Sequence, residues 1–108
     1  MTSPTWDHTS QEHDIILRRG GRLHGRGFDG WVGGRPVEVR SCRRDDRYRL
    51  QQDVHRSLVA GHGSYIFVSP SGRTKTISAR RVSVMLGPGR WFRDRVYPHR
   101  FLTREEVW

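Results

Sequence analysis

Two acidic residues, Asp29 and Glu38, stand at equal distances on either side of the pair Gly33-Gly34. Glycine reaches positive φ without steric cost, so this pair predicts a two-residue hairpin loop. Counting outward from the loop places Asp29 opposite Glu38. The sequence therefore predicts two carboxylates that face each other across a hairpin.

Side chains alternate between the two faces of a strand, which sorts the hairpin residues into two sets. The apolar set is expected to face the core and comprises Phe28, Val32, Val37 and Val39. The other set comprises Asp29, Trp31, Glu38 and Arg40. Both carboxylates are thus expected on the face away from the valines.

The two carboxylates of the expected pair repel each other. Asp29 and Glu38 fall at a non-hydrogen-bonded position of the hairpin, where the Cα atoms of a pair are about 4.5 Å apart. Like charges directly opposite each other destabilise a sheet, so a positive group must offset them. Arg40 supplies one charge, and a hard cation such as Mg²⁺, which prefers carboxylates and water, offsets the repulsion better. The alternative from spacing alone is an exposed charge pair without a ligand.

At these residues the chain resembles the PD-(D/E)XK nuclease superfamily, which has the restriction-endonuclease-like fold. Members carry an Asp on one hairpin strand and Glu-x-Lys on the next, matched here by Asp29 and by Glu38-Val39-Arg40. Arg40 stands where the family has its lysine. Arginine supplies the positive charge, but with a pKa above about 12 it cannot act as a base.

Two further positions match the family outside the hairpin. A family helix that bears a glutamine is matched by Gln51 and Gln52, and a glutamate of the first helix is matched by Glu12. The order of helix, hairpin, helix and strand over about residues 10–69 is also similar to that of small archaeal Holliday-junction resolvases.

The resemblance implies a small α/β (α+β) domain, a central mixed β-sheet flanked by helices. It implies a DNA-binding, metal-dependent endonuclease that hydrolyses phosphodiester bonds and selects junction or branched DNA, with Mg²⁺ or Mn²⁺ as cofactor. The implied metal ligands are Asp29, Glu38 and Glu12, and the implied catalytic residues are Asp29, Glu38, Arg40 and Gln52. Two alternatives stay open: a catalytically impaired nucleic-acid-binding module of the same fold, and an unrelated basic RNA- or ribosome-associated protein whose hairpin carboxylates are structural.

The charge of the chain indicates a polyanionic partner. Its 108 residues carry a formal net charge of +9, with a pI near 11.3, and Lys75 is the only lysine. Such a balance is typical of proteins that bind nucleic acid, and the planar guanidinium matches phosphate. The arginines near the hairpin are expected to contact DNA phosphates: Arg22, Arg26, Arg43, Arg44, Arg47 and Arg49. The alternative is a solvated basic face.

Aromatic residues near the C-terminal end alternate with arginines: Trp91, Phe92, Tyr97 and Phe101. They are expected to close the core or a homodimer contact, and the alternative is a platform on which unpaired bases stack. His55 is expected at the surface.

The remaining pattern gives one domain over residues 9–108 after a disordered tail over residues 1–8. Thr9 and Glu12 have capping-box spacing, which predicts a helix that ends at Gly20-Gly21. A weak strand is expected over 22–27, strands over 28–32, 36–42 and 65–68, a charged loop over 43–47, and a helix over 51–60. Residues 74–86 suit either a strand or a helix, and a helical turn is expected from Thr103.

Several classes of protein are excluded by composition. No apolar run approaches the roughly 18 residues of a membrane span. Cys42 is the only cysteine, which rules out a disulfide framework within the chain. The first residues are polar and lack an apolar signal segment. A cytoplasmic protein without membrane association is expected.

Overall fold

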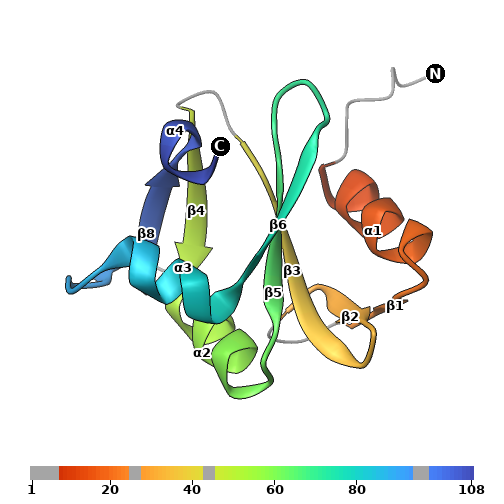
Figure 1. Cartoon of the computed structure of the whole chain (residues 1–108), viewed down its shortest axis with the longest axis horizontal. Coiled ribbons are helices and arrows are strands. Elements are labelled where there is room, and N and C mark those ends of the chain that lie inside the picture. The colour runs from red at the N-terminus through yellow and green to blue at the C-terminus, as the bar shows by residue number, and fades with distance from the viewer. Residues whose placement is uncertain (1–7, 25–27, 43–45, 94–97) are drawn as a thin grey trace.

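Two β-sheets and four helices make up the described part of the chain, residues 8–24, 28–42, 46–93 and 98–108 of a computed structural model (Figure 1). The larger sheet has the order β1-β2-β3-β5-β6, with β1 Arg22–Leu23, β2 Gly30–Val32, β3 Arg35–Ser41, β5 Ser64–Val68 and β6 Thr74–Ser78. The smaller sheet has the order β4-β8-β7, with β4 Arg47–Gln51, β8 Pro98–Thr103 and β7 Phe92–Arg93. The helices are α1 His8–Arg18, α2 Gln52–Ala60, α3 Ala79–Leu86 and α4 Arg104–Val107.

The predicted α+β class and the mixed sheet flanked by helices are confirmed. Strands β3 and β5 run parallel, while the other neighbours in the larger sheet are antiparallel. The connection between the parallel pair passes through β4 and α2, which is the long crossover that parallel strands require. No helix within the described ranges is long and apolar enough to cross a membrane.

The β2–β3 hairpin turns at the predicted loop. Gly33 and Gly34 have φ of 59° and 75°, the left-handed region that glycine enters without strain. Val32 pairs with Arg35 and Gly30 pairs with Val37, so the register counted from the sequence is confirmed up to Gly30.

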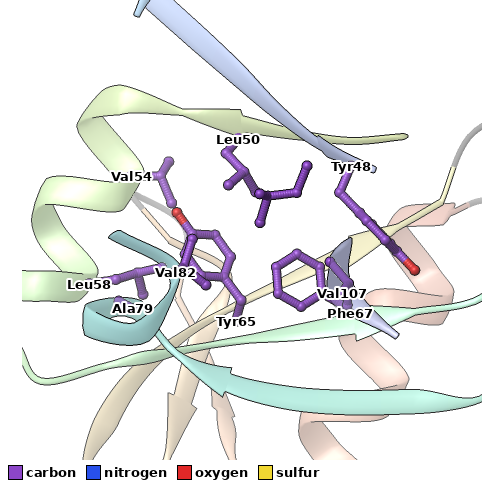
Figure 2. Close-up of a cluster of buried hydrophobic side chains, with 10 residues drawn as sticks. Tyr48, Leu50, Val54, Leu58, Tyr65, Phe67, Ala79, Val82 and Val107 are labelled. Carbon is purple, nitrogen blue, oxygen red and sulfur yellow. The ribbon is translucent and has the colours of Figure 1, made fainter. Parts of the chain in front are cut away.

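The two faces of the larger sheet bury separate apolar clusters. Helix α1 covers one face, where Ile16 packs against a cluster completed by Val37, Val39, Ile66 and Val68. The smaller sheet and the other helices cover the opposite face (Figure 1). The cluster there, drawn in Figure 2, comprises Tyr48, Leu50, Val54, Leu58, Tyr65, Phe67, Ala79, Val82, Leu102 and Val107.

The smaller sheet is absent from the sequence prediction, which treated residues 43–47 as a loop. In β4 the fully buried Tyr48 and Leu50 alternate with more exposed Arg47, Arg49 and Gln51. This alternation is the pattern of a half-buried strand. The expected helix over 51–60 accordingly begins one residue later, at Gln52.

The structure also settles three other segments for which the sequence predicted a helix or a strand. Helix α1 begins at His8, so Thr9 lies inside it and the expected tail, apart from His8, lies outside the described residues. Residues 74–86 hold both structures, a strand and then a helix capped by the Ser78 side chain. The helical turn after Thr103 is confirmed, with Glu106 completing its capping box.

Candidate active site

Asp29 lies directly before β2, and the regular pairing of β2 with β3 ends at Gly30, next to it. Its backbone N–H donates to the Val37 carbonyl at 3.1 Å, and its carboxylate oxygen Oδ2 accepts from the Val39 N–H at 2.8 Å. Asp29 and Gly30 therefore both oppose Val37, which is the arrangement of a β-bulge. The predicted cross-strand pair of Asp29 and Glu38 is wrong in this detail, because the Asp29 side chain takes the place of a backbone acceptor.

The bulge also reverses the face of the residue before it. The Phe28 ring lies 4.9 Å from the Trp31 ring and packs against the larger cluster in Figure 2, whereas Val37 and Val39 lie under α1. The prediction that Phe28 shares the valine face is therefore wrong. An extra residue in a strand shifts the two-residue alternation by one position.

Glu38 is buried, with only 3% of its surface exposed. Arg40 Nη2 donates to its Oε2 at 2.7 Å. Its other oxygen, Oε1, is buried and meets no hydrogen-bond donor among the described residues. Burying a carboxylate oxygen that accepts no hydrogen bond from the protein costs free energy. Oε1 is therefore a candidate ligand atom for a cation.

Burial raises the pKa of Glu38 to about 8, against an ordinary value of 4.5. The Arg40 guanidinium opposes this rise, while the negative charges of Asp29 and Glu12 and a hydrogen bond to Asp29 add to it. That hydrogen bond forms only when one of the two carboxyl groups carries a proton, since two carboxylates have no donor between them. The raised pKa of Glu38 favours its protonated form near neutral pH, and in the ionised form its Oε1 accepts from no donor among the described residues.

These groups line an open cavity of about 560 Å³. Its lining residues come from α1, from β1 and the segment between β1 and β2, from β3, and from the junction of β4 with α2. The lining residues are His13, Leu23, His24, Phe28, Asp29, Glu38, Arg40, Gln51 and Val54. The structure thus brings Asp29, Glu38 and Arg40 together in one cavity.

Two of the other expected site residues are placed differently. The cavity is lined by Gln51, the last residue of β4, and Gln52 at the start of α2 is not part of the lining. Glu12 lies on α1 with its Oε1 3.4 Å from the Ser41 hydroxyl, outside the lining but close enough for its charge to raise the pKa of Glu38.

Sequence reasoning missed His13 and His24 as lining residues. His13 comes from the first helix and His24 follows β1, and no local pattern marks either as part of a site. They join the cavity only in the folded protein, because α1 and β1 pack beside the hairpin, so the sequence alone could not identify them.

Three of the six arginines expected around the hairpin are described, and they lie on different sheets. Arg22 is exposed on β1, whereas Arg47 and Arg49 belong to the smaller sheet. Arg26, Arg43 and Arg44 lie outside the described residues.

His55 is buried, so the expectation of a surface histidine is wrong. Its Nδ1 lies 3.0 Å from the Tyr65 hydroxyl and its Nε2 lies 2.7 Å from the Ser83 hydroxyl. Burial, together with the charge of Arg100, lowers the pKa of His55. Both ring nitrogens therefore have hydrogen-bond partners inside the protein, and burial favours the neutral form of the ring.

The donor set suits a hard divalent cation. The described residues contain no group of three or more His, Cys, Asp or Glu side chains placed to hold a metal ion. Mg²⁺ needs fewer protein ligands, because it binds through one or two carboxylates and keeps waters and substrate phosphates in its remaining positions. Asp29 and Glu38, with the donorless Oε1, fit this requirement.

Comparisons with known proteins identify no relative: no family model and no curated protein matches the chain, and no solved structure matches its fold.

Proposed function

We propose that the protein is a metal-dependent endonuclease that hydrolyses phosphodiester bonds of DNA, with Mg²⁺ or Mn²⁺ held by Asp29 and Glu38. The observation that carries the proposal is the buried Glu38 Oε1, which accepts from no donor among the described residues and belongs to a side chain that lines an open cavity together with Asp29. When bound there, the cation supplies charge stabilisation at the phosphoryl oxygens of the substrate.

The other groups in the cavity suit the same reaction. Arg40 lines the cavity and places a permanent positive charge where the phosphate would lie, which stabilises the charge that develops during displacement. His13 and His24 also line it, and their ring nitrogens can form hydrogen bonds with a phosphate or a water molecule. The net charge of +9 favours a DNA substrate, and we place the activity in the cytoplasm.

A second function has an observation in its favour. Arg40 pairs with Glu38 at 2.7 Å and thereby offsets the charge that a cation would otherwise offset. This contact supports a nucleic-acid-binding module of the same fold that has lost cleavage. Homodimerisation stays a prediction.

The test is a cleavage assay on supercoiled plasmid and branched DNA with Mg²⁺ or Mn²⁺. We expect cleavage by the wild type and its loss in Asp29→Asn, by about 10²–10³-fold or more. Asp14→Asn is the matched control, because Asp14 is an exposed acid paired with Arg18 on α1, away from the cavity lining.

Arg40→Lys separates the two functions. This substitution restores the residue type of the resembling family, so an active nuclease should keep or gain cleavage. If neither the wild type nor Arg40→Lys cleaves DNA with either metal, the nuclease proposal fails and the binding module takes its place.

A further inference from the structure

The smaller sheet presents one face away from the core, here named the outer sheet face. On β4 the residues of this face are Arg47, Arg49 and Gln51, which alternate with the buried Tyr48 and Leu50. Their partners across the ladder are Thr103, Phe101 and His99 of β8, and Phe92 of β7 pairs with His99. One face thus gathers two arginines, two phenylalanines and a histidine from three strands.

The aromatic rings of this face lie next to one another. The His99 ring is 5.1 Å from the Phe101 ring and 6.4 Å from the Phe92 ring. The Arg47 guanidinium lies 4.1 Å over the Phe101 ring, which extends the row by a second planar group. Phe92 is 66% exposed, so the end of the row on β7 is an uncovered ring.

The charge of the outer sheet face complements a phosphate backbone. Its described side chains include the guanidinium groups of Arg47 and Arg49, whose planar N–H donors match phosphate oxygens. Exposed aromatic rings interleaved with arginines are the combination by which proteins bind single strands, with bases on the rings and phosphates on the cations. A protein partner would more often meet an apolar centre from which charges are depleted.

Spacing selects an unpaired strand over a duplex. The ring centroids of this row lie 5.1 Å apart for His99 and Phe101 and 6.4 Å apart for His99 and Phe92. Bases stacked in a duplex repeat every 3.4 Å, so they cannot each meet a separate ring of this row. An extended single strand can place successive bases about that far apart.

The outer sheet face leads to the candidate active site. Gln51 pairs with His99 at one end of the face and also lines the cavity that holds Asp29 and Glu38. A strand that lies along the rings is therefore directed to the carboxylates.

We propose that the outer sheet face binds single-stranded DNA, stacking unpaired bases on Phe92, on His99 and on the Arg47 guanidinium that covers Phe101, and holding phosphates with Arg47 and Arg49. The bound strand is a substrate only if the proposed nuclease function is correct, so that part of the inference rests on it. Binding itself requires no cleavage.

The test measures binding of fluorescein-labelled dT₂₀ and of a 20-base-pair duplex by anisotropy, in EDTA so that no cleavage occurs. We expect Phe92→Ala to weaken dT₂₀ binding by about five- to hundred-fold and duplex binding by less than two-fold. Phe92 is exposed, so the variant should fold as the wild type does. Val84→Ala, which removes apolar surface from an exposed position on α3, is the control and should leave both affinities unchanged.

Arg47 supplies a second, independent readout. Arg47→Lys keeps the charge but loses the planar stack on Phe101, so it should weaken dT₂₀ binding while preserving the salt slope. Arg47→Ala should also lower that slope, by about 0.7 for one lost phosphate contact. A 2-aminopurine base in the oligonucleotide should be quenched on binding to the wild type and less so with Phe92→Ala.

The proposal is overturned if dT₂₀ does not bind, if Phe92→Ala weakens the duplex as much as dT₂₀, or if U₂₀ binds at least tenfold tighter than dT₂₀. These results are independent of cleavage. Wild-type binding of dT₂₀ without any metal-dependent cleavage would refute the nuclease and leave the single-strand face in place.

Discussion

Replacing Glu38 by glutamine should stabilise the metal-free protein. Glutamine has nearly the same shape as glutamate, and its carbonyl can accept from Arg40 while its amide donates to Asp29. The variant thus keeps the Arg40 contact and the Asp29 contact but removes a buried carboxylate whose Oε1 lacks a donor.

The size and sign of the effect follow from the pKa of Glu38, about 8 in the folded state against an ordinary 4.5. Below pH 4.5 the side chain is protonated in both states and costs nothing. Between pH 4.5 and 8 the unfolded chain has released the proton and the folded one keeps it, so wild-type stability falls by about 1.4 kcal/mol for each pH unit. Above pH 8 the loss levels off at about 5 kcal/mol.

The assay is urea denaturation of both proteins at a series of pH values from 4 to 9, in EDTA. The difference in unfolding free energy between Glu38→Gln and wild type should be near zero at pH 4 and grow steadily to pH 8. Glu105→Gln, at an exposed position on α4, should change stability by less than about 1 kcal/mol. A difference that does not vary with pH would refute the reasoning, because a purely structural effect of the substitution has no proton linkage.

Two further predictions concern the packing around the site. Gly30→Ala should destabilise the protein by about 1–3 kcal/mol in chemical denaturation, because an added Cβ would lie 2.4 Å from the Arg22 carbonyl oxygen and 3.1 Å from Ile16 side-chain atoms. Unchanged stability would show that β1 and α1 do not pack closely against Gly30. Since burial lowers the pKa of His55, wild-type stability should fall as pH drops below about 6.5, where the unfolded histidine gains its proton. His55→Gln should lack this part of the acid loss, and equal acid slopes in denaturation curves would contradict it.

The hairpin could be predicted from sequence because its cause is local. Gly33 and Gly34 fix the turn, and the register of the next residues follows by counting. The bulge at Asp29 could not be predicted in this way, since it depends on a side chain that replaces a backbone acceptor for Val39.

Strand β4 was missed because its partner is remote in sequence. Arg49 pairs with Phe101, and no sequence pattern between these two residues predicts the pairing. The cavity lining could not be completed from the sequence for the same reason, because His13 and Gln51 join it only through the packing of α1 and of the smaller sheet. The burial of Glu38 was also unforeseen, because the alternation of β3 was expected to expose that face and the smaller sheet instead covers most of it.

The remote pairing of β4 has a consequence for how the chain folds as it is made. The hairpin and its carboxylates can form as soon as the first 41 residues are free, since their contacts are short-range. Among the described residues β4 pairs only with β8, so its backbone edges stay unpaired until residues near 103 have been synthesised. Unpaired edges of this kind are where nascent chains aggregate or bind chaperones. The order of synthesis therefore allows the carboxylate hairpin to form before the strands of the smaller sheet can pair.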